Sequence, residues 1–495
     1  MANVNQQPVK STYQFALVLS VLLVAVILRC WNLNQSFWWD EIWSTMPYAT
    51  APSLWQTINS VGYYFNNHLF YSLLARFSIM LLGENEIAAR LPAVIMGLAG
   101  IAAVFFIGKK LLGTGSGALG ALLLAVSAFH IDHSSEARGY AGLALFSLLS
   151  SYYFLDGLRS NRFKTWLLFS VFTILGFYTH PFMLAVCLAQ FFCTVLFFAA
   201  GKAGLQRIEV TFKVLPSVAL SLLSAAIITL ILYAPVISTF LHNLKKVRIV
   251  SVTRWPFLMS LFSSWCPGID SPAGILVYGA LYCWGIIIIS RQNPHMAIYT
   301  VVLSVVPLVL YLLLNPMFVF ERYFIFALPF ILLVIGSALA ALAERLSGIY
   351  RIGAVSLCLL TLLYLQWPSL HTILTQDRQD YRDAVQFVEQ HMTDAPSELV
   401  FSIGYAGDHF RYYAPKRQMF VPESLAELKK QSVGRKRIWC LLTAWLPAIR
   451  PAHEDRALYA EKPGQTEIYN YVQTHFEKKK IFPSRFPVEV YCYEP

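Results

Sequence analysis

The residues best suited to chemistry lie in one short segment, residues 36–43, which reads SFWWDEIW. Asp40 and Glu41 are adjacent carboxylates among four aromatic side chains. Tryptophans that anchor a membrane interface, with acids in the first turn of a helix, explain this composition structurally. A catalytic interpretation is equally open, because burial against apolar surface raises the pKa of a carboxyl group and makes it a usable base.

A second polar segment, residues 130–140, reads HIDHSSEARGY. Histidine and carboxylate side chains bind divalent ions, but the spacing here matches no known metal pattern. We therefore favour a polar, hydrogen-bonded loop and assign no metal site. Glu136 and Arg138 open an apolar segment, and ionisable groups at that depth in a membrane indicate function.

Several basic or polar residues are candidates for binding a phosphate. Arg322, in the sequence Glu321-Arg322-Tyr323, either pairs with Glu321 or binds phosphate. His180, in a tight turn, either forms hydrogen bonds at the interface or contacts a phosphate. A basic loop, residues 235–272, contacts solvent and lipid headgroups or forms a phosphate clamp; its candidates are Lys245, Lys246, Arg248 and Arg254.

The composition predicts that the elements carrying these residues cross a membrane. The chain has 495 residues, of which 57% are hydrophobic and 13% are charged, whereas about 25% are charged in soluble domains. Twelve apolar segments recur up to about residue 368, and about 20 apolar residues cross a bilayer as a helix. The net charge of +11 is explained by basic loops between the spans, without nucleic acid as a partner.

Basic clusters between the apolar segments predict the topology, because such clusters stay in the cytoplasm. The clusters fit this rule if residues 67–83, which include His68 and Arg76, lie on the membrane surface as an amphipathic helix. About eleven spans then remain, with the N-terminus in the cytoplasm and Asp40 on the outer side.

The last part of the chain differs in character. Residues 1–368 form the predicted membrane domain, and residues 369–495 the predicted extracytoplasmic α/β domain. In the latter, helices are expected at 380–392 and 424–431, and strands at 398–403, 437–443 and 488–493.

Taken together, these motifs resemble the GT-C glycosyltransferases, particularly the branch of the protein O-mannosyltransferases and the lipid A aminoarabinose transferase. The resemblance covers about residues 14–345, except that residues 68–71 read HLFY where the family commonly has a Pro-Pro pair before the tyrosine. The matching segments are residues 39–41 (WDE), 67–71 (NHLFY), 83–92 (GENEIAARLP), 135–140 (SEARGY), 178–180 (YTH) and 321–323 (ERY).

The resemblance implies a transfer reaction and roles for individual residues. The donor would be a polyprenyl-phosphate sugar, and the acceptor an extracytoplasmic glycan, lipid or protein. Asp40 would be the general base of an inverting displacement, and Glu41 and Glu136 would orient it, bind the acceptor or hold a metal. Arg138, Tyr323 and His68 would line the same cavity. A divalent cation is left open, because relatives differ in metal use.

The resemblance also implies a multi-pass protein of a bacterial inner or plasma membrane, in contact with membrane lipids. Two other functions fit some of the features. A transporter or flippase of lipid-linked substrates would explain the spans, although no internal repeat is visible. A glycan polymerase or ligase that uses a lipid-pyrophosphate donor would need outer basic residues but not Asp40.

Overall fold

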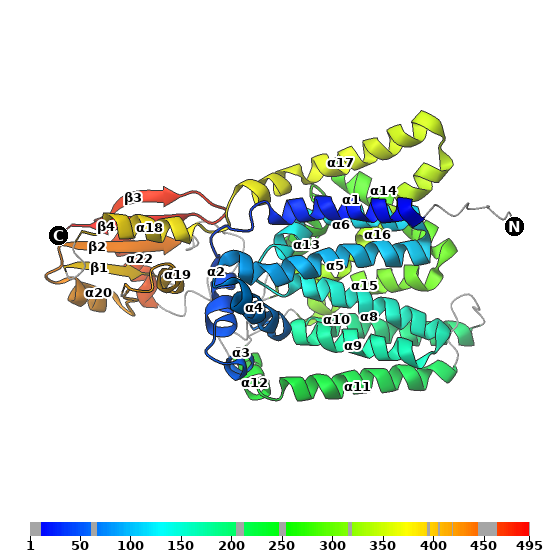
Figure 1. The fold of residues 1–495 in the computed structure, drawn as a ribbon, viewed down its shortest axis with the longest axis horizontal. Coiled ribbons are helices and arrows are strands. Elements are labelled where there is room, and N and C mark those ends of the chain that lie inside the picture. Colours follow the sequence, from blue (N-terminus) through cyan, green and yellow to red (C-terminus); the bar gives the residue numbers. More distant parts are fainter. Residues whose placement is uncertain are drawn as a thin grey trace.

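A computed structural model describes residues 11–60, 67–203, 212–246, 254–314, 319–393, 397–403, 406–417, 419–443 and 463–494. The molecule is elongated, with a bundle of long helices and a smaller sheet-containing domain at one end of it (Figure 1). Helix α1 (Ser11–Cys30) starts at the far end of the bundle and runs toward the small domain. The segment that follows α1, which contains Asp40, therefore lies at the junction of the two parts.

The bundle consists of apolar helices. Within the described ranges, eight helices are long and apolar enough to cross a membrane. They are α5 (Glu86–Leu112), α8 (Tyr140–Ser160), α10 (Met183–Lys202), α11 (Leu215–Tyr233), α14 (Pro272–Gln292), α15 (Pro294–Leu314), α16 (Leu328–Arg345) and α17 (Gly348–Thr375). Helices α6 (Thr114–Val126) and α7 (Ala128–Ser134) form a pair bent by 65°. Helices α1, α4 (Leu69–Leu82) and α9 (Phe163–Thr179) are apolar but shorter.

Each apolar segment of the sequence thus coincides with a helix or with the bent pair, and the polytopic helical fold is confirmed. The count of eleven spans and the surface position of α4 remain predictions. Short elements complete this part: α2 (Trp39–Ser44), the π-helix η1 (Thr45–Ala49), α3 (Leu54–Asn59), the 3₁₀ helix η4 (Phe212–Val214), α12 (Ile237–Lys246), α13 (Arg254–Trp265) and the 3₁₀ helix η5 (Glu321–Ala327).

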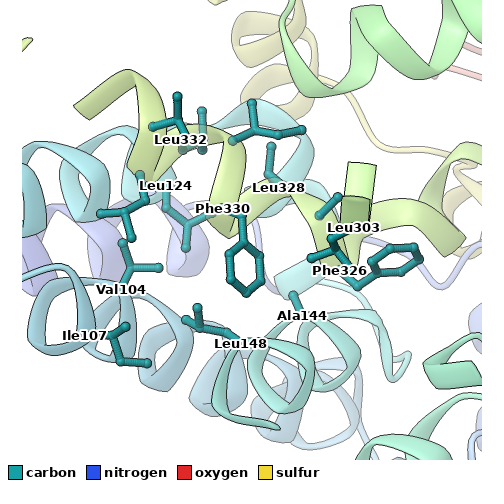
Figure 2. Packing of buried hydrophobic residues seen from close by; sticks show 14 of the residues in the cluster. Val104, Ile107, Leu124, Ala144, Leu148, Leu303, Phe326, Leu328, Phe330 and Leu332 are labelled. Atoms are coloured by element: carbon teal, nitrogen blue, oxygen red, sulfur yellow. The ribbon is translucent and has the colours of Figure 1, made fainter. Parts of the chain in front are cut away.

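Helix α16 is the central element of the core, and its residues from Leu328 to Ala341 are buried. A Cβ atom at Gly336 would lie 2.5 Å from the backbone nitrogen of Gly120 in α6, so the two helix backbones are in contact. Small residues permit such close approach between membrane helices. Figure 2 shows the surrounding apolar packing, in which Phe330 of α16 lies near Leu148 of α8. This packing fixes the helices that carry the site residues.

A buried arginine stabilises the bend between α6 and α7. Arg29, near the end of α1, donates hydrogen bonds to the carbonyl oxygen of Ala125 (3.0 Å) and to Oγ of Ser134 (2.8 Å). Ser127 caps the new helix by accepting a hydrogen bond from the backbone nitrogen of His130. Because a broken helix leaves carbonyl groups without partners, Arg29 stabilises the direction of α7 and of the polar segment that follows it.

The C-terminal domain contains a four-stranded mixed sheet in the order β1-β2-β4-β3. Strands β1 and β2 are parallel, and the pairs β2–β4 and β3–β4 are antiparallel. The strands are β1 (Glu398–Ser402), β2 (Arg437–Thr443), β3 (Glu477–Phe482) and β4 (Val488–Tyr493). The helices are α18 (Tyr381–His391), α19 (Ala406–Tyr413), α20 (Leu425–Ser432) and α22 (Pro463–His475).

Alternating residues of the strands face two layers of helices. Trp439 and Leu441 of β2 pack with α18 and α19, whereas Ile438 and Cys440 pack with α20 and α22. Alternation with a period of two is typical of a strand, and it gives this sheet an apolar layer on each face. The predicted small α/β domain is therefore confirmed, while the division of the chain at residue 368 remains a proposal.

Candidate active site

Helix α2 presents the two adjacent acids at the junction. Trp38 is its N-cap residue, and Oε2 of Glu41 accepts a hydrogen bond from the backbone nitrogen of Trp38 at 3.2 Å. A carboxylate three residues after the N-cap satisfies a backbone donor that the helix leaves free. Asp40 and Glu41 thus occupy the first turn, but their side chains have different partners.

Glu41 is fully engaged in a buried ion pair. Its Oε1 accepts from Nε of Arg90 at 2.7 Å, and its Oε2 accepts from Nη2 of Arg90 at 2.6 Å. The backbone nitrogen of Ala137 donates to Oε1 at 2.6 Å. Arg90 also donates to the carbonyl oxygens of Leu33 and Gln35, both at 2.7 Å. Both oxygens of Glu41 are therefore occupied, and the pair holds the segment after α1 against α5.

Asp40 has a different environment. Its Oδ2 lies 2.8 Å from Nη2 of Arg322 in η5, and the two side chains remain 14% and 18% exposed. Nε of Arg322 donates to the hydroxyl of Tyr140, the first residue of α8, at 2.9 Å. Asp40 is thus partly exposed, whereas Glu41 is buried.

Arg138 places a second positive charge beside Asp40. Its Nη1 donates to Oγ of Ser44 at 2.7 Å and contacts the backbone oxygen of Asp40 at 3.4 Å. Its Nη2 lies 3.3 Å from the hydroxyl of Tyr140. The guanidinium groups of Arg138 and Arg322 therefore share one tyrosine hydroxyl, and both lie next to α2.

Two histidines also belong to this cluster. The ring centroids of His68 and His180 lie 4.9 Å apart, and the ring centroids of His180 and Tyr323 also lie 4.9 Å apart. Burial, followed by the positive charges of Arg138 and Arg322, lowers the pKa of His180 to about 3. Burial and then the charge of Arg138 also hold the pKa of His68 well below its usual value. Both rings are therefore neutral near pH 7, and the two arginines supply the positive charge.

Glu136 lies in a separate cluster that includes residues of the C-terminal domain. Its carboxylate contacts Nδ1 of His133 at 2.7 Å and Nη1 of Arg378. Arg378 also pairs with Asp132, which accepts from Arg485 at 2.9 Å as well. Although burial opposes its charge, Arg378 and then His133 lower the pKa of Glu136 to about 2. Glu136 is therefore an ionised partner of Arg378, and its hydrogen bonds join it to that cluster.

The predicted basic clamp is only partly described. Lys245 and Lys246 end α12, and Arg254 begins α13, but their side chains, and Arg248 as a whole, lie outside the described residues. The structure brings together six of the predicted site residues, namely Asp40, His68, Arg138, His180, Arg322 and Tyr323. The basic clamp stays a prediction.

The sequence left open whether the protein binds a divalent cation, and the described residues can be searched for its ligands. Within them, no group of three or more His, Cys, Asp or Glu side chains is arranged to hold a metal ion. Asp132 and Glu136 face arginines, and Glu41 faces Arg90. The geometry therefore gives the cation no set of ligands in this part of the chain.

Hydrogen bonds join the segment after α1 to the C-terminal domain. The hydroxyl of Tyr413 accepts from the backbone nitrogen of Phe37 at 2.8 Å, and Oε1 of Gln379 accepts from that of Trp39 at 2.9 Å. The sequence motifs did not identify these partners or Arg378. The one available signal was the density of charged and amide side chains at residues 376–383 (QDRQDYRD), directly after the last apolar helix.

Comparison with known proteins identifies the architecture. The family model of dolichyl-phosphate-mannose-protein mannosyltransferases matches residues 67–238. The crystal structure of ArnT from Cupriavidus metallidurans bound to undecaprenyl phosphate superimposes with a TM-score of 0.57 at 13% identity, covering 97% of this chain and 98% of that chain. The chain has the GT-C fold. The resemblance seen in the sequence motifs is thereby confirmed.

Two further structures share this GT-C fold. The apo state of the same ArnT gives a TM-score of 0.59 at 12% identity, with 97% of each chain covered. The oligosaccharyltransferase AglB from Archaeoglobus fulgidus, in complex with an inhibitory peptide and a dolichol-phosphate, gives 0.51 at 12% identity, covering 88% of this chain and 70% of that chain. No curated protein sequence matches the chain. At these identities the likeness concerns the GT-C fold itself.

Proposed function

We propose that this chain is an inverting glycosyltransferase that moves a sugar from a polyprenyl-phosphate donor to an extracytoplasmic acceptor. The Asp40–Arg322 pair carries this proposal, because it places a partly exposed carboxylate 2.8 Å from an arginine, a side chain suited to bind phosphate. The GT-C fold and the ArnT structure that holds undecaprenyl phosphate support a lipid-phosphate donor.

Asp40 is the best candidate for the general base. Glu41 is bound by Arg90 through both oxygens, and Glu136 is bound by His133 and Arg378. Among the residues that the structure describes, Asp40 forms an ion pair with Arg322 alone, and its side chain is partly exposed. A general base must come within hydrogen-bond reach of the proton that it takes, and Asp40 meets this condition better than either glutamate.

Arg322 is suited to bind the donor phosphate. Its Nε and Nη2 bind Tyr140 and Asp40, and among the residues that the structure describes its Nη1 has no hydrogen-bond partner. A guanidinium group binds phosphate through charge-assisted hydrogen bonds. Arg138 adds a second charge nearby, and neutral His180 adds a ring nitrogen that can donate a hydrogen bond.

The transfer is a single displacement at the anomeric carbon. Asp40 takes the proton of the acceptor hydroxyl or amine while the acceptor atom forms its bond to C1. The bond between C1 and the phosphate oxygen breaks, and the polyprenyl phosphate leaves with the electron pair. Arg322 and Arg138 stabilise the charge that develops on the phosphate. Attack opposite to the leaving group inverts the configuration.

The proposal places the site on the extracytoplasmic side of a bacterial inner or plasma membrane, with the C-terminal domain on that side. Helix α1 starts at the opposite end of the bundle from this domain (Figure 1), which fits a cytoplasmic N-terminus. Reporter fusions to the C-terminal domain test this, and a cytoplasmic signal would contradict it.

The enzyme assay compares purified wild type with Asp40→Asn, using polyprenyl-phosphate sugars and measuring the polyprenyl phosphate released. Loss of a general base lowers turnover by about 10²–10⁴-fold, while donor binding should persist. Asp270→Asn is the matched control, because Asp270 is an exposed acid outside this cluster. Equal turnover by wild type and Asp40→Asn would rule out the base.

A further inference from the structure

Arg378 of the C-terminal domain is tightly held beside the first turn of α2. It lies between α17 and α18, and its side chain is 8% exposed. Ion pairs to Asp132 and Glu136 fix its guanidinium group from the side of α7. The guanidinium carbon lies 4.5 Å from the centre of the Trp38 ring.

The same indole ring also contacts the proposed active site. The guanidinium carbon of Arg322 lies 5.7 Å from the centre of the Trp38 ring. Arginine groups within about 6 Å of a tryptophan ring are attracted by its π-electrons. Trp38 therefore contacts Arg378 of the C-terminal domain and Arg322, the ion-pair partner of Asp40.

Trp38 is also connected to Asp40 through the backbone. It is the N-cap residue of α2, two positions before Asp40. The ring and its backbone are buried, so a displacement of the ring would move the start of the helix. The position of the Asp40 carboxylate thus depends on how the Trp38 ring is held.

We infer that Arg378 is a positioning residue for Asp40 that acts through Trp38, so that the C-terminal domain completes the active site. This inference rests on the proposed glycosyl transfer. It separates Arg378 from Arg485, which also binds Asp132 but is not among the cations over the Trp38 ring. If Arg378 served only to attach the domain, its loss would lower activity only as far as it lowers the stability of the fold, as the loss of Arg485 would.

The test measures kcat and the donor KM for full-length Arg378→Gln, Arg378→Lys and Arg485→Gln. Displacement of a catalytic group by about 1 Å can cost about 100-fold. We expect Arg378→Gln to lower kcat by about 10–100-fold with little change in KM, and Arg485→Gln to lower it much less. Arg378→Lys should recover part of the activity, because it keeps the charge without the planar guanidinium group.

A double-mutant cycle tests the route through Trp38. If Arg378 acts through this ring, the double variant Arg378→Gln/Trp38→Leu should be no slower than Trp38→Leu alone. Arg417→Gln controls for nonspecific effects of mutation and purification, because Arg417 forms a partly exposed pair with Glu389 in the same domain. Thermal unfolding of each variant identifies those that fail to fold.

The outcomes separate the two proposals. A wild-type protein that transfers no sugar would contradict the glycosyltransferase function. An active wild type with additive effects of Arg378→Gln and Trp38→Leu, or with equal losses in Arg378→Gln and Arg485→Gln, would overturn only the role of Arg378. A folded Arg378→Gln variant with wild-type kcat would overturn that role as well.

Discussion

Glu41 and Arg90 form a bidentate ion pair, in which the two side chains are 1% and 0% exposed, respectively. The pair lies directly beside Asp40, yet it leaves no oxygen of Glu41 available for chemistry. Of two neighbouring acids in one turn of helix, the first therefore pairs with Arg322 and stays partly exposed, and the second holds the backbone in place. This division of roles motivates the first prediction.

Arg90→Gln should lower the free energy of unfolding strongly. Removing one partner leaves a buried, uncompensated charge, which costs about 3–5 kcal/mol. Thermal unfolding in detergent, followed by tryptophan fluorescence, measures the change. Arg417→Gln breaks a partly exposed pair, and ion pairs near the surface are worth about 0–1 kcal/mol, so it serves as the control. Equal shifts in the two variants would contradict the role given to Arg90.

Arg322→Gln should weaken donor binding more than it changes folding. The substitution removes the positive charge beside Asp40 while retaining a polar side chain. We expect the Kd for polyprenyl phosphate, measured by titration of the purified protein, to rise by about 10-fold or more, the factor for 1.4 kcal/mol. Tyr140→Phe keeps both positive charges and removes only the hydrogen bonds that Arg322 and Arg138 donate to the hydroxyl, so it should change Kd less. Unchanged binding in Arg322→Gln would exclude this residue from the phosphate site.

Asp380→Asn should make stability less dependent on pH. Asp380 lines a polar cavity of about 560 Å³ with Asp377 and Asp383. Burial, and then the charge of Asp383, raises the pKa of Asp380 from 3.8 to about 6. A carboxyl group whose pKa rises on folding destabilises the folded state once it ionises. The variant should therefore unfold at a higher temperature than wild type at pH 7.5, and the advantage should vanish as the pH falls toward 4.

Asparagine keeps the helix cap that Asp380 provides to the backbone nitrogen of Asp383. The comparison therefore isolates the charge. A constant difference in unfolding temperature across this pH range would contradict the assignment.

Gly336→Ala should destabilise the bundle. Its Cβ would lie 2.5 Å from the backbone nitrogen of Gly120, so α6 and α16 would have to separate. Overpacking of this kind typically costs about 1–3 kcal/mol. Gly279→Ala in α14 is the matched control, because a Cβ there meets nothing within 4 Å. The yield of monodisperse protein after detergent extraction should fall for Gly336→Ala alone.

The fold was largely predictable because its main signal is local. Long apolar segments are detected without knowing their neighbours, and the alternation in β2 and β4 gives their bounds, 437–443 and 488–493. Strand β3 (Glu477–Phe482) was missed. Its sequence EKKKIF is charged and its first five residues are exposed, as is common in edge strands that must avoid pairing with other chains.

The candidate site was predictable only in part. Asp40, Arg138 and Arg322 were recognisable because ionisable residues at the ends of apolar segments are rare. The different partners of Asp40 and Glu41 could not be predicted, because Arg90 lies 49 positions from Glu41 in the sequence. The role of Arg378 could not be predicted for the same reason, because its partners Asp132 and Glu136 lie more than 200 positions before it in the sequence.

The contacts between the segment after α1 and the C-terminal domain impose an order on assembly. Phe37 and Trp39 are made early in synthesis, yet their partners Tyr413 and Gln379 leave the ribosome hundreds of residues later. A nascent chain whose helices are already inserted therefore still lacks the groups that hold α2. On the proposed topology, the segment that carries Asp40 gains these contacts only after the final domain has been exported and docked, so an incompletely translated chain should lack activity.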